Sequence, residues 1–341
     1  MTITIDEFLR LRELLPVVDV RSESEWNQGH VAGTTNIPIL NDAERIIVGT
    51  TYKQQGQKQA IREGFRLVGP RLEALVKRAE GVGPEFIVHC WRGGMRSHNF
   101  CQFVNMIGLK THQLEGGYKE YRHRAQRTFA RSFKIVLLTG LTGSGKSEVL
   151  RALKVAGEQV IDLETLASHK GSVFGGLTMP AQPTTEQFEN DLFESLLGLD
   201  PDRRVWLEDE SIAIGKIFLP AEFWKRMNDA PVLEIEVPKQ ERISRLVSEY
   251  KHVSAELFHE AMTGITKRLG GQHYNSARER LYAGDLAASI EIILNYYDKA
   301  YANAIDRKRD RVVDKIEWDG KDVSAFAGLL SRQGLSLQNH Y

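Results

Sequence analysis

Cysteine is scarce in this 341-residue chain, which has only Cys90 and Cys101. Two cysteines cannot form the disulfide framework of a small secreted protein, and they are too few for a structural zinc site of four cysteines. Their scarcity favours a reducing compartment, so we expect a cytoplasmic protein. Each thiol therefore needs its own explanation, either as a reactive group or as part of a core.

A net charge of one sign is also absent, because 45 Lys and Arg residues balance 45 Asp and Glu residues. A nucleic-acid partner would therefore need a local basic face. The longest apolar runs are a few residues, far short of the roughly 20 that a membrane span needs. Met1–Asp6 lacks the basic start and apolar run of a signal peptide. We expect no membrane partner, and the length and the 42% hydrophobic share suit two ordinary domains.

The chain does contain two anion-binding loops, one in each half. The second, GLTGSGKS at residues 140–147, follows an apolar run and fits the P-loop pattern G-x-x-x-x-G-K-[ST]. Its glycines allow backbone N–H groups to surround a diphosphate, and the following helix adds its positive N-terminal end. Lys146 supplies a point charge, and Ser147 supplies a hydroxyl suited to Mg²⁺. The residues expected to bind diphosphate are Gly140, Thr142, Gly143, Ser144, Gly145, Lys146 and Ser147.

An acidic partner for this P-loop is expected at the end of a second strand. VWL at residues 205–207 is typical of a strand and runs into EDES at residues 208–211. Asp209, or else Glu208, would hold Mg²⁺ together with Ser147, although a solvated acidic turn explains the cluster as well. Arg242 and Arg245 fit either a lid over phosphates or a charged surface helix. The P-loop motif does not identify its phosphorylated ligand, and a nucleoside triphosphate is the ligand expected by default.

The first loop, CWRGGMR at residues 90–96, follows the strand-like run at residues 86–89 and fits C-x5-R. Such a loop surrounds the sulfur with N–H groups and binds an oxyanion, which favours a reactive thiolate at Cys90 beside Arg92 and Arg96. The alternative is an inert buried cysteine. Cys101 lies on the apolar face of the next helix, where a core position is a better explanation than a resolving thiol.

The remaining pattern divides the chain near residue 130. The stretch at residues 117–134 is strongly basic and falls where a domain connection is expected. After it, strands and helices alternate in the manner of an α/β fold with a mostly parallel sheet, and residues 255–306 are mainly helical. We therefore predict two α/β domains, at residues 1–130 and 131–341.

The first half resembles the rhodanese family. VDVR at 18–21, EW at 25–26, GHVAG at 29–33 and NIP at 36–38 match the signature of that family, and Cys90 falls where it keeps its persulfide-forming cysteine. Rhodanese domains share their fold with a class of cysteine phosphatases, so C-x5-R alone does not separate the two. Trp91 and the pair Gly93–Gly94 depart from the commonest rhodanese loops.

The order of a rhodanese-like domain, a basic connection and a P-loop NTPase-like domain with a helical C-terminal part resembles the tRNA 2-selenouridine synthases. The segments at residues 49–53, 170–175 and 208–211 are also similar to that family. The resemblance implies a two-step change at the wobble uridine of tRNA. Geranyl diphosphate first alkylates the sulfur of 2-thiouridine, and selenophosphate then replaces the S-geranyl group with selenium. It also implies that the P-loop binds the diphosphate and that Cys90, Arg92 and Arg96 serve selenation.

Partners and pockets follow from the same resemblance. A tRNA would contact a basic face that includes Arg122, Arg124, Arg127, Arg131 and Lys134. A solvated interdomain helix explains that stretch equally well, and its aromatic residues suit helix packing. No tightly bound cofactor is expected, apart from Mg²⁺, and a selenophosphate-producing enzyme is a candidate partner. Phe174, Met179 and Phe188 are candidates for a geranyl pocket or for core packing.

Three other classes of protein remain open. A sulfurtransferase fused to an ATP-dependent kinase-like domain predicts ATP consumption. A cysteine-dependent phosphatase predicts turnover of an aryl phosphate. A module in which both loops only bind anions predicts no turnover and no dependence on Cys90.

Overall fold

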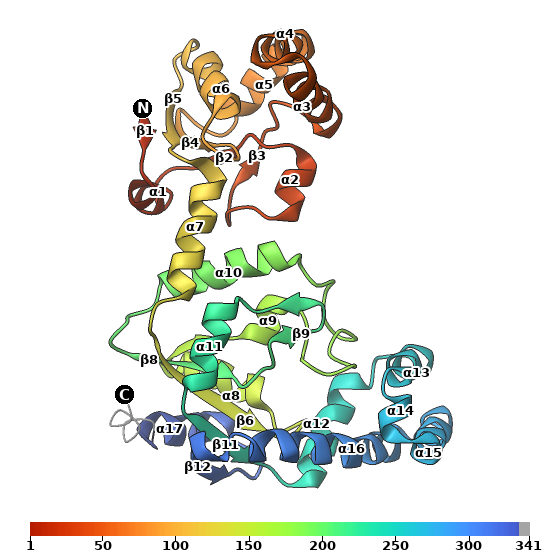
Figure 1. The fold of residues 1–341 in the computed structure, drawn as a ribbon. Coiled ribbons are helices and arrows are strands. Elements are labelled where there is room, and N and C mark those ends of the chain that lie inside the picture. Colours follow the sequence, from red (N-terminus) through yellow and green to blue (C-terminus); the bar gives the residue numbers. More distant parts are fainter. Residues whose placement is uncertain (334–341) are drawn as a thin grey trace. The chain divides into compact units, whose positions relative to one another are not determined.

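The computed structural model describes residues 1–333 and divides them into two compact units (Figure 1). The first unit is Met1–Thr128 together with Glu189–Glu194, and the second is Phe129–Phe188 with the described residues from Ser195 onward. Both units are α/β structures with parallel sheets, which confirms the predicted fold class. Among the described residues, no helix is long and apolar enough to cross a membrane.

The first unit is built on a five-stranded sheet with the order β1-β5-β4-β2-β3, in which every pair of neighbours is parallel. Its elements are β1 (Thr2–Ile3), α1 (Ile5–Leu11), β2 (Val17–Asp19), α2 (Glu23–Gln28), β3 (Thr35–Asn36), α3 (Asp42–Gln55), α4 (Gln57–Val68), η1 (Gly69–Arg71), α5 (Leu72–Glu80), β4 (Glu85–His89), α6 (Met95–Asn105), β5 (Lys110–Leu114) and α7 (Gly117–Phe129).

Both faces of this sheet are covered, as a parallel sheet requires. On one face, Val18 and Val88 pack against buried residues of α5 and α6, such as Phe100. On the other, the ring of Phe8 from α1 meets Tyr121 from α7 edge to face. The short segment Glu189–Glu194 completes this unit.

That segment contributes buried polar contacts. Asn190 Nδ2 donates to Tyr118 Oη at 2.7 Å and to the carbonyl of His30 at 3.0 Å. Asn190 and Tyr118 are both fully buried. The two hydrogen bonds therefore satisfy an amide that would be costly to bury alone.

The second unit contains a five-stranded parallel sheet with the order β12-β11-β6-β8-β7 and a separate antiparallel pair, β10-β9. Its elements are β6 (Lys134–Gly140), α8 (Lys146–Val155), β7 (Gln159–Ile161), α9 (Leu163–Ala167), α10 (Thr185–Leu197, whose middle belongs to the first unit), β8 (Arg204–Glu208), β9 (Ala213–Ile214), β10 (Ile217–Phe218), α11 (Ala221–Asp229), β11 (Val232–Glu236), α12 (Lys239–Tyr250), α13 (Ala255–Thr263), α14 (Thr266–Leu269), α15 (Gly271–Tyr282), α16 (Leu286–Asp306), η2 (Arg309–Arg311), β12 (Val312–Glu317) and α17 (Val323–Gln333).

The middle strand β6 leads directly into the P-loop. Val136 and Leu138 of β6 pack against α8 and α17, in a core that also contains Trp206. Register places Leu138 beside Glu208 of β8 and Gly140 beside Ile235 of β11. The carboxyl ends of these parallel strands therefore meet at one edge, which is where α/β proteins bind ligands.

The helical C-terminal part forms a core of its own. Helices α12 to α16 enclose a cluster that includes Phe174, Phe258, Met262 and Leu294. Figure 1 shows α13, α14 and α15 grouped at one end of the long helix α16. This part confirms the prediction of a helical region after the sheet elements.

Candidate functional site

Cys90 lies at the carboxyl end of β4, in the loop that precedes α6. Its side chain is 3% exposed, and Ser97 Oγ donates a hydrogen bond to Sγ at 3.2 Å. The start of α7 closes the loop from behind, because the Tyr118 N–H donates to the carbonyl of Cys90 at 2.8 Å. Gly117 has φ +60°, and a Cβ there would lie 2.3 Å from the Cys90 carbonyl oxygen. Glycine is therefore required at this contact.

Arg96 is held beside the loop by a two-point ion pair with Glu25. The guanidinium donates to the carboxylate at 2.5 and 3.1 Å. Desolvation acts to raise the pKa of Glu25, but the hydrogen bonds and charge of Arg96 outweigh it and lower this pKa to about 2. Arg92 is exposed. The two arginines of the loop therefore differ: Arg96 is fixed in place, and Arg92 is open to solvent.

A buried polar cluster supports the loop from below. Arg21 is fully buried, pairs with Asp19 at 2.6 Å and stacks on the ring of Tyr118 at 3.8 Å. His89, the residue before the nucleophile candidate, is also fully buried, and burial lowers its pKa. The VDVR motif placed Asp19 and Arg21 in the rhodanese signature, but sequence reasoning assigned them no role in holding the Cys90 loop.

The P-loop encloses the second anion site. Gly143 and Gly145 both have φ +80°, a conformation that glycine adopts at no steric cost. Lys146 Nζ donates to the carbonyl of Gly140 at 3.2 Å, and α8 begins at Lys146. The cavity in front of the loop has a volume of about 330 Å³. It is lined by basic and acidic groups together, including Lys146, Ser147, Glu164, Lys170, Glu210 and Arg245.

Glu164 is the acid that the structure brings to the P-loop hydroxyl. Ser147 Oγ donates to Glu164 Oε2 at 2.6 Å. Asp209, the acid predicted for this role, pairs instead with Lys308 at 2.5 Å. Glu208 is buried at the end of β8, where its carboxylate accepts a hydrogen bond from the Leu163 N–H at 3.2 Å. Within residues 1–333, no group of three or more His, Cys, Asp or Glu side chains is arranged to hold a metal ion.

The sequence alone does not reveal Glu164 as a site residue, because it does not show that β7 lies beside β8. The order of the sheet puts β7 beside β8, so the segment that follows β7 reaches the same edge as the acidic run at residues 208–210. An acid three residues past a short apolar strand was the available signal. It has meaning only once the two strands are known to be adjacent.

Two arginines of α12 donate hydrogen bonds to carbonyl groups of the P-loop. Arg242 is 3% exposed, pairs with Asp298 at 2.8 Å and donates to the carbonyl of Thr142 at 3.1 Å. Arg245 donates to the carbonyl of Gly143 at 3.1 Å. Neither is a free surface charge. Both fix the backbone of the loop through its carbonyl groups.

Glu210 lies in the P-loop cavity with a perturbed acidity. Desolvation of its carboxyl raises the pKa from 4.5 to about 7, the charge of Glu164 adds to this rise, and Lys146 opposes it. Because the pKa is raised, the carboxyl is neutral below about pH 7 and repels an anionic ligand only above it.

We therefore expect Glu210→Gln to strengthen pyrophosphate binding by roughly threefold to tenfold at about pH 8 and to change it little at about pH 6. Isothermal titration of the full-length protein with pyrophosphate in EDTA, at both pH values, measures this. Comparing the variant with the wild type at each pH cancels the titration of pyrophosphate itself. An equal gain at the two pH values would contradict the assignment.

The basic residues predicted to contact RNA mostly have acidic partners. Within the first unit, Arg122 pairs with Glu189, Arg124 with Asp6 at 2.9 Å and Arg127 with Glu120 at 2.6 Å. In the second unit, Lys134 Nζ donates to the carbonyl of Asp202 at 2.8 Å, and Arg131 is exposed. The aromatic residues of the same stretch, Tyr118, Tyr121 and Phe129, are fully buried.

The structure also places the second cysteine and the residues proposed for a geranyl pocket. Cys101 is buried on α6, and burial raises its pKa, as expected of a core thiol. Phe188 is fully buried and Met179 is half-buried. Phe174 lines a small apolar cavity of about 20 Å³. That cavity shares Thr142, Ser172, Leu246 and Tyr250 with the P-loop cavity.

The match to known families decides which family this chain belongs to. Residues 133–328 match the family model described as the tRNA 2-selenouridine synthase AAA domain, and residues 4–124 match the rhodanese-like domain. The chain belongs to the tRNA 2-selenouridine synthase family. Its first half is therefore a rhodanese-like domain, as the resemblance predicted, and its second half is the P-loop domain of that family.

Relatives named tRNA 2-selenouridine synthase match along almost the whole chain. The protein from Shewanella sediminis (strain HAW-EB3) is 34% identical over 88% of this chain and 90% of its own length. The protein from Shewanella piezotolerans (strain WP3 / JCM 13877) is 35% identical over 88% and 91%. The protein from Nitrosomonas europaea is 31% identical over 86% and 90%. The combination of both domains is thus shared with these synthases.

Proposed function

We propose that this protein converts 2-thiouridine at the wobble position of tRNA into 2-selenouridine through an S-geranyl-2-thiouridine intermediate. The observation that carries the proposal is the presence of two anion loops in one synthase-family chain. One presents the Cys90 thiol, and the other presents Lys146 and Ser147. Two different phosphorylated co-substrates, geranyl diphosphate and selenophosphate, need two such loops.

The P-loop unit would carry out the first step. The thiouridine sulfur bonds to the first carbon of the geranyl group, the C–O bond breaks, and diphosphate leaves with the electron pair. The proton on N3 of the base passes to solvent. Lys146 and the loop N–H groups would stabilise the charge that develops on that leaving group. The apolar cavity that adjoins the P-loop cavity at Leu246 and Tyr250 has room for about one water molecule, so the geranyl chain of the diphosphate would lie in the wider P-loop cavity itself.

The donor set beside the P-loop suits Mg²⁺, which prefers oxygen ligands. Ser147 and Glu164 would hold the ion, since their oxygen atoms already lie 2.6 Å apart. Asp209 would join them only after leaving Lys308. A bound Mg²⁺ would neutralise diphosphate charge, and no tightly bound organic cofactor is proposed.

The Cys90 unit would carry out the second step. Selenium of selenophosphate bonds to C2 of the base, the C2–S bond breaks, and sulfur leaves with the electron pair and takes a proton as geranyl thiol. Water then cleaves the P–Se bond, which gives phosphate and selenouridine. Loop N–H groups, Arg92 and Arg96 would bind the phosphoryl group, with the Cys90 thiol at the centre of the loop. An enzyme that makes selenophosphate would supply this co-substrate in the cytoplasm.

The tRNA would be held by the predicted basic face. We expect Arg124→Ala combined with Arg127→Ala to weaken tRNA binding by roughly tenfold and to reduce the salt dependence by about one unit of slope for each lost phosphate contact. Electrophoretic mobility shifts at several salt concentrations measure both quantities.

A matched control exists in the same unit. Lys77 and Lys110 are exposed and, like Arg124 and Arg127, are paired with acids, here Glu73 and Glu85. Lys77→Ala with Lys110→Ala should leave the affinity and the slope unchanged. If both double variants behave alike, the residues at 124 and 127 are only part of a solvated helix.

The direct test is nucleoside mass spectrometry of thiolated tRNA incubated with the protein. Geranyl diphosphate is added first, and selenophosphate follows. The expected result is a geranyl adduct that converts to selenouridine. No mass change under any condition, together with ATP turnover, would overturn the proposal in favour of a kinase-like domain fused to a sulfurtransferase.

A further inference from the structure

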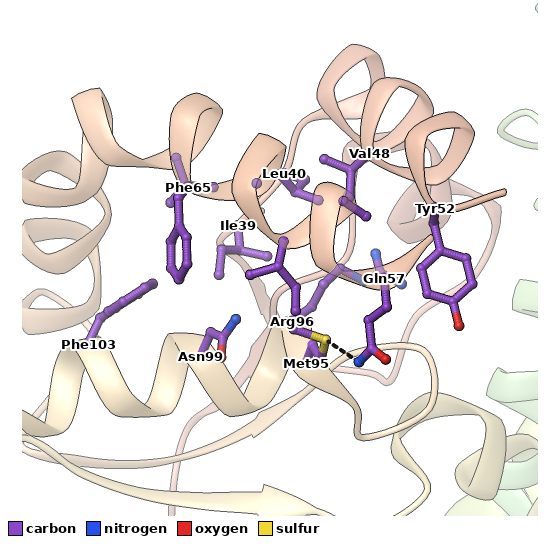
Figure 2. Close-up of a pocket in the computed structure, with 14 residues that line it drawn as sticks. Ile39, Leu40, Val48, Tyr52, Gln57, Phe65, Met95, Arg96, Asn99 and Phe103 are labelled. Atoms are coloured by element: carbon purple, nitrogen blue, oxygen red, sulfur yellow. Dashed lines mark hydrogen bonds between the residues drawn. The ribbon is translucent and has the colours of Figure 1, made fainter. Parts of the chain in front are cut away.

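An apolar pocket lies in the first unit between α3, α4 and α6, beside the Cys90 loop. Its volume is about 140 Å³. Figure 2 shows Val48 and Tyr52 of α3 and Phe65 of α4 on one side of it, with Asn99 and Phe103 of α6 on the other. A cavity of about this size lined by Leu, Ile and Phe is known to bind a ring as large as benzene. The pocket is therefore large enough for a small hydrocarbon group.

Large apolar side chains stay exposed around this pocket. Tyr52 is 58% exposed, Phe65 is 60% exposed and Met95 is 43% exposed, and all three line it. They come from three different helices, so the exposed apolar surface surrounds the pocket and is not confined to a single residue. Exposed apolar residues gathered at a hollow are typical of a binding site.

The pocket and the Cys90 loop share residues. Met95 and Arg96 complete the C-x5-R loop and also line the pocket. The guanidinium of Arg96 is paired with Glu25, so this charged residue brings little uncompensated charge to an apolar lining. A ligand with a polar reacting end at the loop and an apolar tail would fit both parts at once.

We propose that this pocket binds the geranyl chain of S-geranyl-2-thiouridine in the tRNA while C2 of that base reacts at the Cys90 loop. This inference rests on the proposed function. The chain would enter between Phe65, Tyr52 and Met95, and burial of its CH₂ and CH₃ groups would stabilise the complex. The pocket thus selects the alkylated base over the unmodified thiouridine, which has no group to fill it.

The same contact positions the leaving group. When the C2–Se bond forms and the C2–S bond breaks, the geranyl chain departs with sulfur as the thiol. Holding that chain fixes the direction of the C2–S bond relative to the loop, which lowers the cost of orientation. The apolar lining residues are therefore positioning and specificity residues, and they do not touch the reacting atoms.

The test is a substitution that places a larger side chain in the pocket. Ala60 of α4 is buried and lines it, so Ala60→Phe reduces the space for a chain. Full-length wild type and variant are given RNA stem-loops that carry either S-geranyl- or S-methyl-2-thiouridine, with selenophosphate. We expect kcat/KM for the geranyl substrate to fall by roughly tenfold or more in the variant, because several CH₂ groups lose their burial. The methyl substrate should react as it does with the wild type.

A second variant distinguishes loss of the pocket from misfolding of the protein. Phe65 is mostly exposed, so Phe65→Ser leaves the core intact, and it should raise KM for the geranyl substrate alone. Met106→Ala is the control, since Met106 is an exposed apolar residue of the same unit that does not line the pocket. It should change neither substrate.

Failure of the inference and failure of the proposed function give different results. If wild type selenates both RNAs and the two pocket variants keep its preference for geranyl, the inference is wrong. If Ala60→Phe impairs geranylation and spares selenation, the pocket serves geranyl diphosphate, which also overturns it. If wild type selenates neither RNA, the proposed function itself fails.

Discussion

Lys146→Ala is expected to lower the geranylation of 2-thiouridine tRNA by about 10²–10³-fold, the size of effect seen when one preorganised group that stabilises transition-state charge is removed. The ammonium lies at the start of α8, within reach of the loop, and lines the cavity where the diphosphate would leave. Selenation of RNA that already carries the S-geranyl group should be unchanged, because that step uses the other loop. Initial rates of the two half-reactions, measured by nucleoside mass spectrometry, make the comparison.

Lys154 offers a control on the same helix. It is exposed at the far end of α8 and does not line the P-loop cavity. Lys154→Ala should preserve both half-reactions. If Lys146→Ala slows the two half-reactions equally, the P-loop does not act in the alkylation step alone and the division of labour is wrong.

Cys90→Ala is expected to abolish selenation, with a loss of at least about 10³-fold, in line with the effect of removing one member of a group of residues that act as a unit in a preorganised site. The sulfur is buried at the centre of the loop and accepts a hydrogen bond from Ser97, so no other thiol can take its place. Geranylation should persist, and the S-geranyl nucleoside should accumulate in the presence of both co-substrates. Liquid chromatography with mass detection resolves the three nucleosides.

Cys101→Ala is the matched variant, because it removes the other cysteine from the core of the same unit. It should retain selenation. Full selenation by Cys90→Ala would mean that the loop N–H groups and the two arginines suffice for the second step and that the thiol has no part in it.

The elements that touch the sites were predictable because strong local patterns specify them. The P-loop motif and the helical spacing of the residues predict helices at 146–155 and 239–250, and both appear with those bounds. The strand-like pattern at residues 36–39 predicts a strand there, but β3 covers only Thr35–Asn36. Pro38 explains this, since it has no N–H to donate to a strand ladder.

The parts that depend on tertiary pairing were not predictable. β12 is an edge strand with exposed Asp314 and Lys315, so it lacks the continuous apolar run that would predict a strand. Glu164 became a site residue only through the adjacency of β7 and β8. The ion pairs that occupy Asp209 and Arg122 likewise join residues far apart in the sequence. Motifs located both loops, but the partners of their side chains required the fold.

The membership of Glu189–Glu194 in the first unit has a consequence for synthesis of the chain on the ribosome. When Thr128 has been added, all five strands of the first sheet exist, but Asn190 does not, and Tyr118 and the carbonyl of His30 still lack that amide. The first unit therefore reaches its final hydrogen bonding only after residues 129–188 of the second unit have been translated. A fragment that ends at Thr128 would lack these two hydrogen bonds of the complete unit, so the two halves are less separable as genes than the residue ranges of the two family matches suggest.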